Sequence, residues 1–528
     1  MRRSTNRIKL YLYRVALVFA VMIFAWDTYD IFIRQNQTQK LSTLKYSGEH
    51  ITWTPCGDLK GSQVECSNIT VPMDQFDPQN SGDKTFTIPL VRLRSEKATQ
   101  NLVMNPGGPG ASGFEFLYRR GEQIRTIVGN KFHLLSFDPR GVNSSTPVAT
   151  CYPDAKAAAT LSGVRASNPT IDSPEVYAWA QNFVKACADT MGEHAKYTNT
   201  PQTAADINNI LEATYASLYP ERAKRVIIDG IVNQWQRYEE LYEKESMIDT
   251  DTVLDGFFDE CIKAVLFFMA KLREQPISVY INNTNYGLLT YDMLWYNGVF
   301  PTLYKPPTWY TLANNFFKLI QGNATPAFEA YQAGGLEAMP DQSFAFIYLN
   351  DGLSGPKNWP TGRASLLDKI TPWLNESLFS EASFKIYYMK QQWTVPKTHT
   401  YVPQKGVKTA HPLLILSTSY DPVCPLVSAR SANEAFVGSQ IVEVKGYGHC
   451  SVAAASVCLA KRVRAFLEEG TMPKGYTQCE VDAPYFVRPD GSGLVSVQRQ
   501  FDNAEDEKIH LAQVELARDW DFSLPFLY

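Results

Sequence analysis

The 528-residue sequence lacks several features that mark common classes of protein. Its formal net charge of −4 at pH 7 is close to balanced, which excludes a strong electrostatic footprint for nucleic acid. No metal-ligand spacing occurs, and the glycine-rich loop at 105–113 has neither the lysine of a phosphate-binding loop nor the spacing of a dinucleotide fingerprint. No Gly-x-Ser-x-Gly motif occurs either. We therefore expect no cofactor, no metal and no nucleic-acid partner.

What is present indicates a globular protein on the secretory route. Hydrophobic residues make up 45% of the chain and aromatic residues 12%, which is enough for a large core. Asn-x-Ser/Thr sequons without a central proline are spread along the chain and predict a glycosylated exterior. They begin at Asn36, Asn68, Asn143, Asn282, Asn323 and Asn375.

The nine cysteines predict disulfides, because such pairs form and persist in an oxidising compartment. Their odd number leaves at least one thiol over. The pairings that we expect first are Cys56–Cys66, Cys151–Cys187 and one bridge among Cys450, Cys458 and Cys479.

The N-terminal region predicts membrane insertion. Residues 1–9 are basic, and residues 10–26 form an apolar segment interrupted only by Arg14. This segment is either a membrane anchor or a cleaved signal, and no small-residue cleavage site follows it. Residues 27–50 are polar and predict a stalk. We expect a single-pass protein whose bulk lies on the lumenal or extracellular side, with a secreted protein as the alternative.

Two short apolar runs place an acid and a histidine at one edge of a predicted sheet. Residues 413–416 and 441–444 predict buried strands. Asp421 follows the first run, and His449 follows the second in a Gly-x-Gly-His turn. Catalytic groups collect at the carboxyl edge of a parallel sheet, and an acid followed by a histidine is the later part of a Ser…Asp…His order.

Two further predicted strands precede loops of interest. Residues 101–104 run into the glycine-rich loop at 105–113, where glycine allows backbone N–H groups to approach a developing oxyanion closely. Residues 132–137 run into Asp138 and Arg140, which we interpret as a structural pair that holds its own loop.

The order of these motifs resembles the tripeptidyl-aminopeptidase-like branch of the α/β-hydrolases over roughly residues 51–485. The matching segments are 105–113, 138–141, 197–200, 215–222, 226–230, 421–423 and 448–451. The resemblance implies an α/β-hydrolase fold with a mostly parallel central sheet and an inserted helical cap. It also implies a serine exopeptidase that releases short peptides from free N-termini. Asp421 would be the triad acid, His449 the general base, and the backbone around Gly107 and Gly108 part of an oxyanion hole.

The sequence departs from the family between residues 206 and 215. The family pattern there contains a buried strand and a Gly-x-Ser-x-Gly elbow, roughly 20 residues at ordinary strand and turn lengths, and this chain has neither. Ser112 and Ser217 do not lie on a predicted strand-to-helix turn, so no nucleophile is found. We expect either an inactive chain or an incomplete coding sequence, such as one with a skipped exon. The alternative is a membrane-anchored pseudoenzyme that binds peptides.

The loss also bears on the sheet and on the domain organisation. A missing central strand leaves the backbone hydrogen-bonding groups of its two neighbouring strands unpaired, unless residues 226–228 move into its place.

We predict a hydrolase core at 51–232 and 409–485, a helical cap at 233–408 and a C-terminal tail at 486–528, which includes a polar helix over 502–519. Cap acids that could meet a substrate ammonium group are Glu239, Glu240, Glu243 and Asp351.

Overall fold

The structure, a computed structural model, describes residues 43–519 except for positions 48, 167, 207–212, 259–261, 333–341, 487 and 489–500. The chain divides after Ser67 into two units, each of which is considered by itself. The predicted anchor or signal at 10–26 lies outside the described residues. None of the helices that are described is both long and apolar enough to cross a bilayer.

The first unit contains a β-hairpin. Strand β1 (Thr54–Leu59) runs antiparallel to the start of β2 (Ser62–Pro72), with Leu59 opposite Ser62. The two turn residues, Lys60 and Gly61, both have positive φ, which is the conformation that a tight two-residue hairpin turn requires. The Cys56–Cys66 disulfide joins the two strands, so this predicted pairing is confirmed.

One sheet of the second unit contains β3 (Thr85–Leu93), β4 (Gln100–Met104) and β5 (Phe132–Phe137). Their spatial order is β3-β5-β4, with β3 antiparallel and β4 parallel to β5. Every residue of β5 is buried, including the polar His133 and Ser136.

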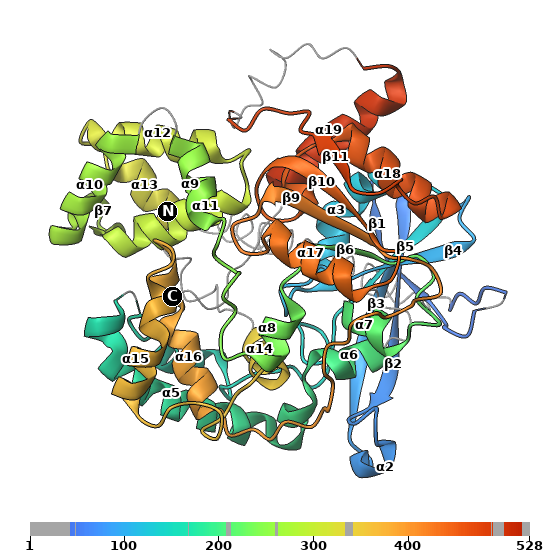
Figure 1. The fold of residues 1–528 in the computed structure, drawn as a ribbon, viewed down its shortest axis with the longest axis horizontal. Coiled ribbons are helices and arrows are strands. Elements are labelled where there is room, and N and C mark those ends of the chain that lie inside the picture. The colour runs from blue at the N-terminus through green and yellow to red at the C-terminus, as the bar shows by residue number, and fades with distance from the viewer. Residues whose placement is uncertain are drawn as a thin grey trace, which may run out of the picture. The chain divides into compact units, whose positions relative to one another are not determined.

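A second sheet is entirely parallel. It contains β6 (Ile227–Asp229), β9 (Leu414–Tyr420), β10 (Gln440–Tyr447) and β11 (Thr477–Glu480) in the order β11-β10-β9-β6 (Figure 1). Helix α17 (Leu426–Ala435) connects β9 to β10 and packs on β9. The predicted class of fold, α/β with a mostly parallel sheet, is confirmed.

Strands β4 and β6 are both edge strands within the part of the chain that is described. β4 pairs only with β5, and β6 pairs only with β9. The side chains of β4 are partly exposed, whereas those of β5 and the first five residues of β9 are buried. The alternative that residues 226–228 move beside residues 100–104 is therefore not found, since these two segments belong to different sheets.

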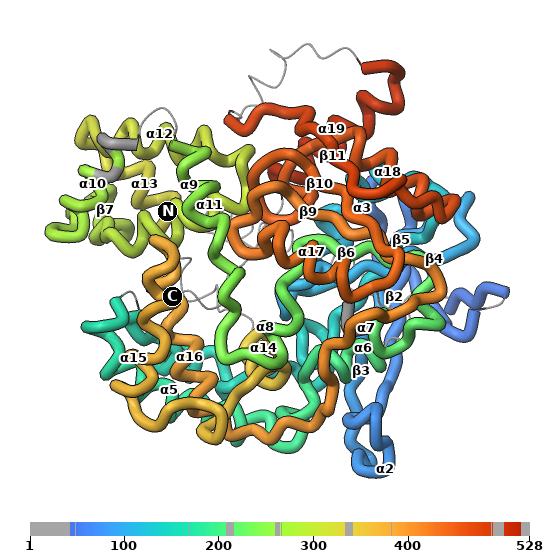
Figure 2. The backbone as a smooth tube through the Cα atoms, viewed as in Figure 1, coloured from blue at the N-terminus to red at the C-terminus, as the bar shows by residue number. Residues whose placement is uncertain are grey.

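Helices on the core carry the glycine-rich loop and the C-terminal end. Helix α3 (Gly113–Val128) begins directly after the loop, and α18 (Val457–Glu469) ends at Gly470 in the left-handed conformation. The predicted C-terminal helix is present as α19 (Ala504–Asp519). It packs on α3 and α18 (Figure 2). Leu516 packs against Phe116, so α19 is an amphipathic helix of the core rather than a polar one.

The region 233–408 is mostly helical, as expected, and forms two apolar clusters. One contains Trp295 and Phe300, and the other joins α5 (Pro169–Met191) to α14 (Ser343–Asp351), α15 (Arg363–Leu374) and α16 (Phe384–Gln392). The hairpin β7 (Ile277–Asn282) and β8 (Asn285–Leu289) was not predicted. The helical elements of this region are α8 (Gln234–Glu239), α9 (Thr250–Phe258), α10 (Ile262–Glu274), η2 (Met293–Val299), α11 (Phe300–Tyr304), α12 (Trp309–Ile320), α13 (Thr325–Tyr331), α14 (Ser343–Asp351), α15 (Arg363–Leu374), η3 (Ser380–Ser383) and α16 (Phe384–Gln392).

The remaining elements lie between the sheets and the cap in sequence. They are α2 (Pro78–Ser81), α4 (Ala155–Leu161), α5 (Pro169–Met191), η1 (Gly192–Tyr197), α6 (Thr200–Asp206), α7 (Ala213–Leu218) and η4 (Ser451–Ala453). The predicted bridge Cys151–Cys187 is confirmed, and the third bridge is Cys458–Cys479. Cys424 and Cys450 are free and buried, while Cys261 lies outside the described residues.

Gly113 marks the close approach of α3 to β5. A Cβ atom there would lie 2.0 Å from the Phe137 carbonyl oxygen and 2.6 Å from the Phe137 nitrogen, and backbone atoms cannot rotate away. We expect Gly113→Ala to lower the free energy of unfolding by about 2–3 kcal/mol through overpacking, measured by urea denaturation. Gly163→Ala is the matched control, because nothing lies within 4 Å of a Cβ at Gly163. Equal stabilities of the two variants would contradict the prediction.

Candidate active site

Asp421 and His449 form a hydrogen-bonded pair at the carboxyl ends of adjacent parallel strands. Asp421 follows β9 and His449 follows β10. His449 Nδ1 lies 3.0 Å from both Asp421 carboxylate oxygens. The Asp421 side chain is 1% exposed and the His449 side chain 12% exposed. The two residues that the sequence singled out are therefore brought together.

The Asp421 carboxylate is held in place by backbone donors on both oxygens. Oδ1 accepts from Val423 N at 3.0 Å and from Cys424 N at 2.8 Å. Oδ2 accepts from Cys450 N at 2.8 Å. These three hydrogen bonds fix the orientation of the buried carboxylate toward the imidazole.

The turn that carries His449 is tied to neighbouring strands. Gly448 N donates to Tyr420 O at 3.0 Å, and Thr418 Oγ1 donates to Gly448 O at 2.7 Å. After the histidine, Ser451 N and Oγ both donate to Asp229 at the end of β6. Three consecutive strands of one sheet thus position this turn.

The cap contacts the histidine through Tyr304 at the end of α11. The Tyr304 ring meets the imidazole edge-on with centroids 5.0 Å apart, and Tyr304 O accepts from His449 N at 3.0 Å. Gly448 has φ +113°, and a Cβ at that position would lie 2.7 Å from Pro306 Cδ. Glycine is therefore required here both for the conformation and for the close approach of the cap.

Two further carboxyl groups and two buried thiols interact electrostatically with Asp421. Burial raises the pKa of Asp229, although its bonds from Ser451 oppose the shift. Burial and the charge of Asp421 raise the pKa of Asp249 to about 6. Burial, with the charges of Asp421 and Asp229, also raises the pKa of the Cys424 and Cys450 thiols. Only Asp229 carried a signal in the sequence, since it ends the predicted strand at 226–228.

The glycine-rich loop keeps the conformations that glycine permits. Gly107 has φ +80° and Gly108 has φ +113°, and a Cβ at Gly110 would lie 2.7 Å from Ser343 Oγ in the cap. The loop follows β4, whereas Asp421 and His449 follow strands of the other sheet. The oxyanion-hole role of Gly107 and Gly108 stays a prediction.

Ser112 and Ser217, the two serines considered as possible nucleophiles, lie at a helix cap and inside a helix. Ser112 Oγ donates to Asp138 Oδ1 at 2.7 Å and accepts from Glu115 N at the start of α3, so it is a helix cap. Ser217 lies within α7 with a buried hydroxyl. The junction where the family places its elbow, residues 207–212, lies outside the described residues.

Asp138 and Arg140 do not form the pair that the sequence predicted, and this interpretation is wrong. Asp138 accepts hydrogen bonds from Ser112 and Asn143. Arg140 instead forms a two-pronged ion pair with Asp206 at the end of α6, and both side chains are almost fully buried. Arg140 was paired with Asp138 because the two residues are close in sequence, whereas its partner in the structure is Asp206.

Two of the four cap acids already have partners inside the protein. Glu243 lies 3.3 Å from Arg237 and accepts from Tyr348 at 3.0 Å. Asp351 accepts from the backbone and hydroxyl of Thr200, and burial raises its pKa to about 6. Glu240 pairs with Lys244 on the surface, and its neighbour Glu239 ends α8. None of the four is brought to the Asp421–His449 pair by these contacts.

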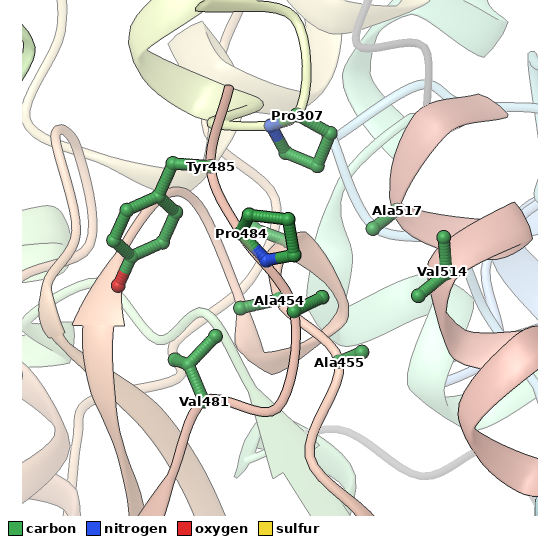
Figure 3. A pocket seen from close by; sticks show the side chains of 10 residues that line it. Pro307, Ala454, Ala455, Val481, Pro484, Tyr485, Val514 and Ala517 are labelled. Atoms are coloured by element: carbon green, nitrogen blue, oxygen red, sulfur yellow. The ribbon is translucent and has the colours of Figure 1, made fainter. Parts of the chain in front are cut away.

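A small apolar cavity is lined in part by residues that follow His449 in sequence (Figure 3). Alanines 453–455 line it together with Tyr485 and with Val514 of α19. Its volume of about 10 Å³ is near the minimum for one water molecule. This cavity is too small for a peptide, so it is a packing feature rather than a substrate site.

Comparisons with known proteins support the sequence resemblance. The family described as TAP-like protein matches residues 378–479, which include Asp421 and His449. The serine protease Hip1 of Mycobacterium tuberculosis (strain ATCC 25618 / H37Rv) is 26% identical over 498 residues, covering 82% of this chain and 91% of that protein. The tripeptidyl aminopeptidase of Streptomyces lividans is 22% identical over 506 residues, covering 84% of this chain and 88% of that protein.

Among solved structures, the hydrolase BphD of Rhodococcus sp. strain RHA1 is similar with a TM-score of 0.27 and 11% identity, over 77% of this chain and 95% of that one. A TM-score of that size carries no structural argument. The fold assignment therefore rests on the strand order and on the positions of Asp421 and His449.

Proposed function

We propose that the gene of this chain encodes a serine exopeptidase that releases short peptides from free N-termini, because the chain is similar to the TAP-like α/β-hydrolases. The observation that carries the proposal is the Asp421–His449 hydrogen bond at the carboxyl edge of a parallel sheet. With its Nδ1 proton donated to Asp421, His449 keeps Nε2 as the base for a serine hydroxyl. Asp421 orients the ring and stabilises the imidazolium that forms.

The nucleophile belongs to a strand and elbow that this sequence does not encode. Support comes from the lack of a Gly-x-Ser-x-Gly motif in all 528 residues and from strands β4 and β6, which are both sheet edges among the residues that the structure describes. In the family order the elbow strand lies between these edges. We infer that the 528-residue chain is inactive, and that a coding sequence with the additional segment produces the active enzyme.

Labelling with a serine-directed phosphonate probe tests this proposal on two proteins. The chain as written is expected to remain unlabelled. A chain with an in-frame strand and Gly-x-Ser-x-Gly elbow between residues 206 and 215 is expected to be labelled at the inserted serine. His449→Ala in the longer chain should slow peptide hydrolysis by about 10³-fold or more, since residual catalysis then depends on the oxyanion hole and binding alone.

The controls separate the alternatives. Replacement of the inserted serine by alanine should abolish labelling, and sequencing of the transcript across this junction identifies which chain the cell produces. Labelling of the chain as written would refute its inactivity, and mapping the label would name the nucleophile. Peptide binding without labelling in both chains would favour the second candidate, a membrane-anchored peptide-binding pseudoenzyme, which the missing motif also supports.

A further inference from the structure

The catalytic pair, Asp421 and His449, and the neighbouring Cys424 have the chemistry of zinc ligands. A carboxylate oxygen of Asp421, the sulfur of Cys424 and a ring nitrogen of His449 all lie within 4.8 Å of one another. Cysteine thiolate, imidazole and carboxylate are the groups that bind Zn²⁺ in proteins. We propose that Asp421, Cys424 and His449 form a binding site for one Zn²⁺ ion.

The positions of these atoms are close to those that a bound ion needs. Ligands of a tetrahedral zinc, at bond lengths of about 2.0–2.3 Å, lie roughly 3.5 Å from one another. The three donor atoms therefore lie at most about 1 Å farther from one another than the ligands of one bound ion. Three protein ligands leave the fourth position to water, which is the arrangement of an open rather than a closed zinc site.

The local backbone holds two of the ligands in register. Asp421 Oδ1 accepts from Cys424 N at 2.8 Å, so the acid and the thiol lie on one tight turn before α17. His449 reaches the same turn through its hydrogen bond to Asp421. The site thus needs no movement of a strand or of the cap.

The charge around these ligands favours a cation. Asp229 lies near His449 and Asp421, and Asp249 lies near Asp421. Burial raises the pKa of the Cys424 thiol, and the positive charge of Arg237 opposes this shift. Arg237 already forms an ion pair with Glu243, with 3.3 Å between Nε and Oε1. A divalent ion would place positive charge among these acidic side chains.

A bound ion would also regulate the proposed exopeptidase, and this consequence rests on the proposed function, whereas the binding does not. Zinc held by both Asp421 and His449 replaces the proton that these residues share. His449 then cannot act as a general base toward a serine. In the longer chain, zinc should inhibit phosphonate labelling and a chelator should restore it.

Binding is tested on the full chain as written, freed of metal and with its disulfides Cys56–Cys66, Cys151–Cys187 and Cys458–Cys479 intact, so that no nucleophile is needed. Calorimetric titration with ZnCl₂ is expected to give one equivalent of saturable binding. Titration with Co²⁺ is expected to give a thiolate-to-cobalt charge-transfer band. Both signals should be lost in Cys424→Ser and kept in Cys450→Ser, the matched control for the other described free thiol.

Circular dichroism shows whether each variant is folded, and alkylation mapping of the unmutated chain gives a readout that needs no variant. Zinc should protect Cys424 from alkylation more strongly than Cys450. Several outcomes would overturn the proposal: no saturable zinc binding, a cobalt complex without a thiolate band, unchanged binding in folded Cys424→Ser, or a Cys424–Cys450 disulfide in the protein as isolated.

Discussion

Asp421→Ala is expected to lower the free energy of unfolding by about 3–5 kcal/mol, because three backbone donors lose their acceptor. The nitrogens of Val423, Cys424 and Cys450 all donate to this carboxylate, and those of Cys424 and Cys450 are buried. An unsatisfied buried donor costs about 1–3 kcal/mol. The loss therefore appears in the chain as written, whether or not it is active. Urea denaturation followed by tryptophan fluorescence measures it.

Two control variants separate this effect from a general loss of a surface charge. Asp421→Asn keeps one acceptor oxygen and should lose less stability than Asp421→Ala. Asp368→Ala removes an exposed acid from α15 and should change stability by less than about 0.5 kcal/mol. If Asp421→Ala lost less than about 1 kcal/mol, the three donors would have to find other acceptors or water, and the fixed carboxylate would be refuted.

Arg140→Met is expected to cost about 3–5 kcal/mol of stability, because it leaves the Asp206 carboxylate buried without its partner. Arg140 Nε donates to Asp206 Oδ2 at 2.6 Å, and Arg140 Nη1 donates to Met73 O at 2.7 Å. The side chains are 0% and 1% exposed. The pair ties the loop after β5 to α6, whose last residue is Asp206. Thermal and urea unfolding measure the loss.

The double variant Arg140→Met/Asp206→Leu should recover much of this loss, because both charges are then removed. Burial raises the pKa of Asp206 even beside Arg140. Without the arginine the carboxyl binds a proton more readily, so the deficit of Arg140→Met should shrink as the pH falls from about 7 to about 5. Lys185→Ala breaks the exposed Lys185–Asp189 pair and should cost less than about 1 kcal/mol. A similar small loss in Arg140→Met would contradict the prediction.

The parts of the fold that could be predicted from the sequence are those with a local signal. The buried strands β5, β9 and β10 are short apolar runs, because both faces of a parallel sheet are covered. Asp421 and His449 could be identified because each directly follows such a run. The helix α18 ends at a glycine with positive φ, which is the usual end of a helix.

The contacts that could not be predicted join residues that are distant in sequence. Arg140 lies two residues from Asp138 and 66 residues from Asp206, and only the fold brings Asp206 into contact. The place of Cys424 beside His449 likewise depends on the pairing of β9 with β10. The β7–β8 hairpin lies in a region whose apolar pattern predicted helices. Tyr280 and Tyr286 pair across its two strands, and both side chains are largely exposed. Their pairing could not be recognised from the sequence pattern.

The packing of α19 on α3 sets a limit on how the protein can be produced. The resemblance to the family stops near residue 485, and a recombinant form ended there would lose Ile509 and Leu516 from the core. Phe116 of α3 would then face solvent three residues beyond Gly113, where the helix leaves the glycine-rich loop. A purification tag is therefore better placed after residue 519 than in place of this helix.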